Sequence, residues 1–143
     1  MKLLSIITVI ILFATLTSCN KKPEPKLELF NPEAFAFDLG DSWEVNATIN
    51  AKGFKQKENN NKYFVRLFYT VDLITNKNDT LKKIFSDTLA NNQKNEFIDI
   101  PVEAQIELDS TFETGNYKLL FNIIDAYSEQ AKTAEVNFTL SKE

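Results

Sequence analysis

The chain has 143 residues, a formal net charge of −4 at pH 7 and no histidine. Nucleic-acid binding usually needs a clustered basic surface, so this mildly acidic balance argues against a nucleic-acid partner. The absence of histidine, together with a single cysteine, Cys19, excludes Ser-His-Asp and Cys-His catalysis and removes the commonest transition-metal ligands. We therefore expect a protein that is not an enzyme and that holds neither a metal nor a cofactor.

Residues 1–18 have the three parts of a secretory signal. Lys2 supplies a positive charge, an apolar run follows over residues 3–13, and small residues precede Cys19. The apolar run is shorter than the roughly 20 residues that a membrane-spanning helix needs. The segment Leu16-Thr17-Ser18-Cys19 resembles the lipobox of bacterial lipoproteins, which is an aliphatic residue followed by two small residues and a cysteine.

The lipobox resemblance implies that residues 1–18 form a signal helix that is removed on export. Cys19 then becomes the first residue of the mature protein and carries the lipid that anchors the chain to the membrane. Asn20 stands where an aspartate commonly retains such proteins in the inner membrane, and the residues after it lack the acidic pair associated with surface export. We therefore expect a lipid-anchored outer-membrane protein that faces the periplasm, with surface exposure as the alternative.

Residues 19–26 have the composition of a linker. Pro23 and Pro25 stand among charged residues and favour an extended conformation of about 3.1 Å per residue. This composition predicts a flexible tether that holds the folded part on the order of 20 Å from the lipid. Residues 27–143 are then expected to form one domain.

An alternation of apolar and polar residues with a period of two dominates the rest of the chain. It predicts half-buried strands over 43–52, 98–108, 117–124 and 134–140. The segment 63–73 is apolar on both faces, and we expect it to be a middle strand covered on both sides. Polar breaks separate the strands at 55–62, 75–79, 90–95, 109–116 and 126–130. This spacing predicts an all-β fold, an antiparallel β-sandwich of about seven strands.

The segment 108–117 is a short acidic turn that ends in Gly115-Asn116-Tyr117. It resembles the corner before strand F of immunoglobulin-like and fibronectin type III domains. The resemblance implies an immunoglobulin-like β-sandwich for residues 27–143, in which the Tyr117 hydroxyl bonds to the backbone upstream. Phe121 follows in the same strand, and we expect its ring to fill the space between the two sheets.

The carboxylates do not form a recognisable catalytic or metal-binding motif. Asp38 and Asp41 flank Gly40, a spacing that fits a turn held by side-chain-to-backbone hydrogen bonds better than a calcium loop. Glu103 and Glu107 alternate with apolar residues, as expected of a solvated strand face. Paired-carboxylate catalysis needs two acids that converge across a cleft. We therefore assign no catalytic residue and no metal ligand.

The aromatic residues are candidates either for core packing or for binding. Trp43 and most of the phenylalanines fall on apolar-facing positions and are expected in the core. Phe54, at a strand end, and Tyr127, in a turn, are better candidates for exposed rings. We expect these two residues to belong to a partner-binding loop surface.

Three short segments share one pattern, an aspartate followed by a hydroxyl residue and then a small apolar residue or threonine: Asp79-Thr80-Leu81, Asp87-Thr88-Leu89 and Asp109-Ser110-Thr111. Each resembles the O-glycosylation motif of Bacteroides-like bacteria. All three fall at expected turns or strand ends, where a glycan could be attached. The resemblance makes Thr80, Thr88 and Ser110 candidate glycosylation sites.

Two functional hypotheses follow from these observations. The first is a non-enzymatic, lipid-anchored immunoglobulin-like module that binds or assembles with a protein partner in the cell envelope. The second is a carbohydrate-binding surface lipoprotein that captures polysaccharide on exposed aromatic rings. An exposed, coplanar pair of rings on one sheet face would favour the second hypothesis, whereas polar or charged faces throughout would favour the first.

The lipid anchor can be tested by replacing its attachment point. We expect Cys19→Ala to release the protein from membranes or to leave a larger, uncleaved precursor, because the acylated thiol is lost. Metabolic labelling with palmitate, followed by membrane fractionation, measures both effects. Label that persists in the Cys19→Ala protein would refute lipidation at this residue.

Overall fold

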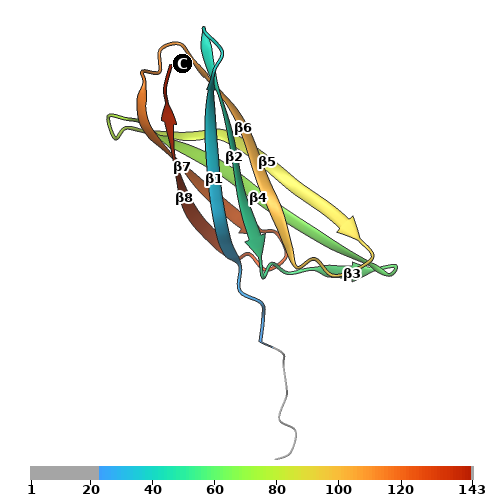
Figure 1. The fold of residues 1–143 in the computed structure, drawn as a ribbon. Coiled ribbons are helices and arrows are strands. Elements are labelled where there is room, and N and C mark those ends of the chain that lie inside the picture. The colour runs from blue at the N-terminus through green and yellow to red at the C-terminus, as the bar shows by residue number, and fades with distance from the viewer. Residues whose placement is uncertain (1–22, 143) are drawn as a thin grey trace, which may run out of the picture.

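The computed structural model describes residues 23–142, so the expected signal helix and Cys19 lie outside the described residues. Within this range the regular structure consists of eight antiparallel strands, which confirms the predicted all-β class (Figure 1). The strands are β1 (Glu28–Asp38), β2 (Ser42–Lys52), β3 (Lys57–Asn59), β4 (Lys62–Ile74), β5 (Thr80–Gln93), β6 (Asp99–Asp109), β7 (Gly115–Asp125) and β8 (Ala131–Leu140).

The strands form two sheets. One sheet has three strands in the order β1-β2-β6, and the other has five, in the order β3-β4-β7-β8 with β5 also paired to β4. The short strand β3 pairs with the start of β4 in a hairpin through Asn60 and Asn61, both of which have positive φ. The expected break over 55–62 is therefore partly wrong, because these polar residues form a backbone ladder.

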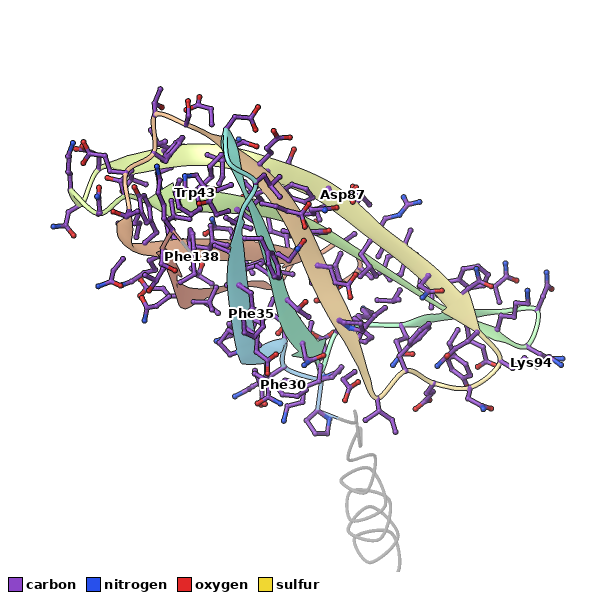
Figure 2. All side chains as sticks on the ribbon, turned by 45° about the horizontal axis from the view of Figure 1, so that its top comes forward. Phe30, Phe35, Trp43, Asp87, Lys94 and Phe138 are labelled. Atoms are coloured by element: carbon purple, nitrogen blue, oxygen red, sulfur yellow. The ribbon has the colours of Figure 1, made fainter. Side chains whose placement is uncertain are left out.

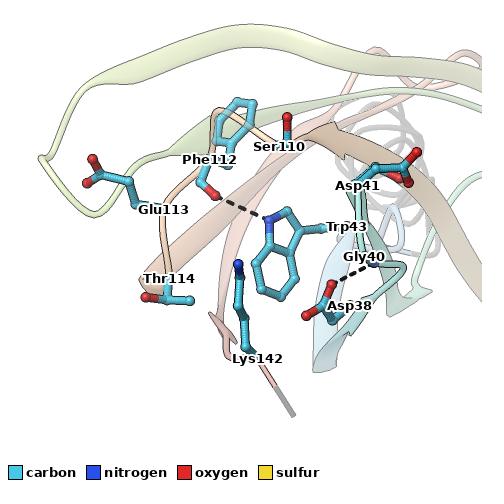
Figure 3. A pocket seen from close by; sticks show the side chains of 10 residues that line it. Asp38, Gly40, Asp41, Trp43, Ser110, Phe112, Glu113, Thr114 and Lys142 are labelled. Carbon is cyan, nitrogen blue, oxygen red and sulfur yellow. Dashed lines mark hydrogen bonds between the residues drawn. The ribbon is translucent and has the colours of Figure 1, made fainter.

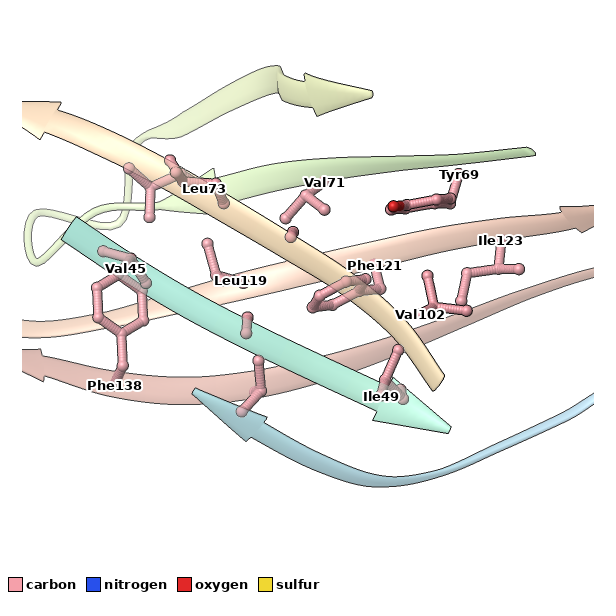
Figure 4. Close-up of a cluster of buried hydrophobic side chains, with 14 of the residues drawn as sticks. Val45, Ile49, Tyr69, Val71, Leu73, Val102, Leu119, Phe121, Ile123 and Phe138 are labelled. Atoms are coloured by element: carbon pink, nitrogen blue, oxygen red, sulfur yellow. The ribbon is translucent and has the colours of Figure 1, made fainter. Parts of the chain in front are cut away.

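The inner faces of the two sheets meet in one apolar core (Figure 4). Along β2 and β6 every second residue is buried, and the register places the buried residues of the two strands opposite one another. Phe121 is fully buried, and Trp43 is 4% exposed with its indole N–H donating to the Phe112 carbonyl at 3.2 Å. Burial of such side chains contributes about 1.5–3 kcal/mol each. The predicted core positions of Trp43 and Phe121 are confirmed.

The outer face of the five-stranded sheet differs from expectation. Strand β4 is a middle strand, paired with β5 on one side and β7 on the other. However, Phe68 on β4 and Ile124 beside it on β7 are 44% and 46% exposed. The expectation that residues 63–73 are covered on both sides is wrong, because this face looks toward solvent in the described part of the chain.

Strand β5 is longer than its polarity suggests. It runs to Gln93 and pairs with β4 as far as Tyr63, so the expected break over 90–95 is wrong for its first residues. The last three residues of β5 are polar and exposed. An edge strand with a solvated face can accommodate such residues, and the ladder with β4 satisfies their backbone on one side.

The two sheets are joined by a hydrogen bond as well as by apolar contact. The hydroxyl of Tyr69 on β4 donates to the carbonyl of Glu103 on β6 at 2.7 Å. Burial of the hydroxyl, followed by the nearby carboxylates of Asp87 and Glu103, raises the pKa of Tyr69 to about 12. Tyr69 therefore remains neutral, and a hydrogen-bond donor, at all physiological pH values.

Tyr117 makes the hydrogen bond that the immunoglobulin resemblance implies. Its hydroxyl donates to the carbonyl of Glu113 at 2.7 Å, and the side chain is 4% exposed. Its ring stacks on Phe138 of β8, with ring centres 5.6 Å apart. The turn before β7 is thus fixed to the strand that it begins.

A buried carboxylate organises a bulge between β4 and β5. Asp72 lies where the β4–β5 register shifts, and it is 4% exposed. Its oxygens accept hydrogen bonds from the Lys83 N–H at 2.8 Å and the Lys82 ammonium at 2.9 Å. Burial alone would raise the pKa of Asp72, but these donors and the nearby amide of Asn122 outweigh it and lower the pKa. Lys83 has φ of +53°, which fits the bulge.

The free energy of unfolding of the domain should depend on pH in a way that reflects the ionisation of Asp72. A carboxyl whose pKa is lower in the folded state than in the unfolded state stabilises the fold at pH values above its unfolded-state pKa, which is about 3.9. This stabilisation is lost as the pH falls through the folded-state pKa. We expect Asp72→Asn to destabilise the domain by about 1–3 kcal/mol at neutral pH and the difference from the parent to shrink below about pH 4. Chemical denaturation across pH, with the exposed Glu107→Gln as control, measures this. A pH-independent difference would contradict the assignment.

Two substitutions in β7 rank the contributions of the corner and the core. We expect Tyr117→Phe to cost about 0.5–1.5 kcal/mol, because only the hydroxyl bond is lost. Phe121→Ala should cost more, about 3–5 kcal/mol, because it empties space between the two sheets. Urea unfolding of the domain gives both values. Equal and negligible losses would show that the register of β7 is wrong.

Candidate functional site

Three phenylalanines form a row on the outer face of β1. Phe30, Phe35 and Phe37, here called the phenylalanine row, lie opposite outward-facing residues of β2. Phe35 is 61% exposed and Phe37 is 53% exposed. Phe30 is half-buried, with the ammonium of Lys52 5.4 Å from its ring centre. Figure 2 shows Phe30 and Phe35 following one another along the strand.

A bulge places these rings on one face. The β1–β2 register shifts between Phe30 and Glu33, where β1 has one residue more than β2, and Asn31 has φ of +49°. An extra residue reverses which side chains point inward. The small residues Ala34 and Ala36 therefore pack against the core, and the phenylalanines between and beyond them point outward. A sequence pattern that assigns large apolar residues to the core misses this row.

Polar groups border the phenylalanine row. Glu44 lies opposite Phe37, and Asn46 lies opposite Phe35 and donates a hydrogen bond to the Glu44 carboxylate at 2.7 Å. A shallow hollow of about 570 Å³ beside Phe37 is lined in part by these two polar side chains and by Ser141. The surface thus combines exposed rings with hydrogen-bonding groups.

A second hollow of about 410 Å³ lies at the end of the domain near Trp43 (Figure 3). It is bordered by the β1–β2 turn and by Lys142. The Asp38 carboxylate accepts the N–H of Gly40 at 2.8 Å, and Gly40 has φ of +91°. This confirms the expected side-chain-held turn. Within residues 23–142 no group of three or more acidic, histidine or cysteine side chains is arranged to hold a metal ion.

The expectation that Phe54 is an exposed ring is wrong. Phe54 is 3% exposed and packs edge-to-face on Phe97, with ring centres 6.4 Å apart. Gly53, with φ of +68°, turns the chain at the end of β2 so that the next side chain closes the end of the core. Tyr127 is half-buried, and the Lys57 ammonium lies 4.3 Å from its ring centre. These two residues do not form an exposed aromatic pair.

The candidate glycosylation sites lie in three settings. Thr80 is the first residue of β5, and Ser110 follows β6 in a turn, so both positions agree with expectation. Thr88 lies in the middle of β5, opposite Phe68, rather than at a strand end. All three side chains are exposed. Their glycosylation stays a prediction.

The acidic residues of β6 form a solvated face, as expected. Glu103 and Glu107 are exposed and alternate with buried residues. At the end of the strand, the Asp109 carboxylate accepts hydrogen bonds from the hydroxyl and the N–H of Thr111, and these bonds lower the pKa of Asp109. Glu103 and Glu107 therefore face solvent, and Asp109 stabilises the turn that follows the strand.

A buried carboxylate ties together the loops at the other end of the domain. Asp125 is fully buried. Its oxygens accept the N–H of Lys55 at 2.7 Å, the N–H of Tyr127 at 2.9 Å and the Ser128 hydroxyl at 2.5 Å. The loop after β2 and the turn between β7 and β8 are thereby held to one another.

The neighbouring Gln130 holds the N-terminal segment. Its side-chain carbonyl accepts the N–H of Leu27 at 3.0 Å, and its amide donates to the carbonyl of Pro25 at 2.9 Å. Leu27 is fully buried, and a Cβ at Gly53 would lie 1.9 Å from the carbonyl oxygen of Lys26. The last part of the expected flexible tether is therefore fixed to the domain. The described residues contain no helix long and apolar enough to cross a membrane.

No family model matches the chain, and no curated protein matches it. Among solved structures, the chain is similar to a protein from Archaeoglobus fulgidus. The two share 12% sequence identity, with a TM-score of 0.37, over 81% of this chain and 100% of the other. So low a similarity carries no argument about function, and any functional inference rests on the residues of this chain.

Proposed function

We propose that this chain is a lipid-anchored, non-enzymatic binding module of the bacterial cell envelope. Its lipid would be attached to Cys19, and its place would be the outer membrane, facing the periplasm. The lipobox-like segment before Cys19 supports this location. The surface that supports binding is the phenylalanine row.

An immunoglobulin-like fold is part of this proposal. In immunoglobulin-like sandwiches, strands A, B and E share one sheet, and strands C, F and G share the other. The strand orders β1-β2-β6 and β4-β7-β8 are consistent with that arrangement, and β5 adds an edge strand next to β4. The hydrogen bond from Tyr117 to the upstream turn, at the start of the strand corresponding to F, gives independent support.

The exposed rings of the phenylalanine row carry the binding proposal. Phe35 and Phe37 present large apolar surfaces to water on a strand at the edge of its sheet. Aromatic residues are enriched in protein interfaces, and contiguous exposed apolar surface marks interaction sites. The neighbouring outward-facing residues Glu33 and Glu44 are acidic. A protein partner with an apolar centre and a basic rim complements this surface.

Carbohydrate binding is the second candidate, and the exposed rings on one sheet face, named above as the feature that would favour it, are present. Two exposed rings, Phe35 and Phe37, lie on the same sheet face beside the Glu44 carboxylate and the Asn46 amide. Rings that stack on sugar faces, next to groups that bond hydroxyls, form a suitable platform for polysaccharide. The row consists of phenylalanines without the polar tips of tyrosine or tryptophan, and for this reason we place the protein partner first.

Photo-crosslinking in cells distinguishes the two candidates. We expect a photoreactive residue at position 35 to give one discrete protein adduct, and the same residue at position 68, an exposed phenylalanine position on the other sheet, to give none. Adding Glu44→Lys should abolish the adduct, because the new positive charge repels the basic rim of the proposed partner.

Affinity electrophoresis through gels that contain envelope polysaccharide tests the second candidate. Retardation that is lost in Phe35→Ser/Phe37→Ser, but kept in Phe68→Ser, would favour carbohydrate binding. We expect the double substitution to weaken whichever ligand binds by about tenfold or more, because buried aromatic anchors dominate interface energies. Binding at this surface would be refuted if photo-crosslinking gave no adduct and electrophoresis gave no retardation that depends on the row.

A further inference from the structure

The end of the domain where the chain enters has a defined architecture. We call this end the base. It comprises the N-terminal segment, the β3–β4 hairpin and the loops at 53–56, 94–98 and 126–130, which gather at the lower side of Figure 1. The opposite end carries the β1–β2, β4–β5 and β6–β7 turns together with the C-terminus.

The distance between the proposed lipid anchor and the base is limited because Gln130 holds the chain at Pro25. Only residues 20–24 separate Pro25 from Cys19. A fully extended chain spans at most about 3.6 Å per residue, so the lipidated residue lies within about 22 Å of the base. Strands of eleven residues, such as β2 and β6, span about 36 Å. The base is therefore the end nearest the bilayer, an argument that rests on the proposed lipid anchor.

The base presents one large apolar side chain to the outside. Ile98 is 87% exposed, more than the other large apolar residues of the described chain. Its loop is ordered, because the Gln56 amide donates to the Phe97 carbonyl at 2.9 Å and the Gln56 carbonyl accepts the Phe97 N–H at 2.7 Å. The Phe97 ring packs on Phe54. Because the Phe97 side chain points inward, that of the next residue, Ile98, points outward.

Charge distinguishes the base from the opposite end. The base carries five exposed lysines, which exceed its exposed acids by one: Lys26, Lys55, Lys57, Lys62 and Lys94 against Glu24, Glu58, Glu96 and Glu129. Lys21 and Lys22 precede it in the sequence. The opposite end is dominated by acids, which are Asp38, Asp41, Asp79, Asp109 and Glu113, against Lys77 and Lys142. An anionic leaflet attracts lysines close to its surface and repels the acidic end.

We propose that the base is a membrane-contacting surface, with Ile98 inserted among the headgroups and Lys94, in the same loop, near the lipid phosphates. The occupant of this surface is the anionic leaflet to which the chain is anchored. The clamps made by Gln130 and Gln56 hold the base in place before contact, so docking orders few additional residues. The domain then stands upright on the membrane and presents its acidic end away from the lipid.

Spin labels on the acylated full chain test this orientation. In vesicles of phosphatidylethanolamine and phosphatidylglycerol, a label at Asn95→Cys reports the base, and a label at Lys77→Cys reports the opposite end. An acylated Cys19 does not react with the label. We expect the label at position 95 to be accessible to oxygen and protected from a water-soluble nickel complex, and the label at position 77 to behave in the opposite way. Two labels with equal access to the nickel complex would overturn the proposal.

Substitution at the contact provides the control. Ile98→Ser with Lys94→Gln should shift the label at position 95 toward the nickel complex while the protein still floats with the vesicles. Leu81→Ser, which changes an exposed apolar residue near the opposite end, should leave the signal unchanged. No shift in the double variant would refute the contact. Protein that does not float with vesicles in any variant would refute the lipid anchor instead, so the two failures are distinguishable.

Discussion

The buried Asp125 carboxylate is the constraint on which the base of the domain depends. A carboxylate without exposure to water must be fully hydrogen-bonded, or its desolvation destabilises the fold. Three donors from two separate loops meet this requirement, and the geometry fixes the loop after β2 against the turn after β7. That turn carries Gln130, which holds the incoming chain. The position of the tether therefore follows from the burial of one side chain.

Much of the fold could be predicted because a strand with one buried face has a period of two. Trp43, Tyr117 and Phe121 were assignable to the core because their strands alternate without interruption. The assignment failed where one residue changes the alternation. Gly53 turns Phe54 into the core, and the bulge after Phe30 turns Phe35 outward. Neither change alters the number of apolar residues in its segment, so the sequence period alone does not reveal the change in side-chain direction.

The edge strands of the two sheets are protected in different ways against pairing with a strand from another chain. Strand β5 carries a bulge at Lys83 that the buried Asp72 stabilises, and a bulge with neighbouring lysines discourages edge pairing. Strand β6 carries Pro101, which lacks an N–H, together with the acids on its outer face. Strand β1 lies next to β8, the edge strand of the other sheet, and its exposed phenylalanines project from its outer face. These exposed rings are why we place the binding surface on the outer face of β1.

The proposed orientation and the phenylalanine row constrain one another. Strand β1 begins next to the clamped tether and runs toward the opposite end, so the row extends from Phe30 near the base to Phe37 farther away. On an upright domain these rings face sideways, parallel to the membrane plane. A partner held in the same membrane meets such a surface directly, and its search is confined to two dimensions. The row therefore suits a neighbouring envelope protein better than a ligand that approaches the acidic end from solution.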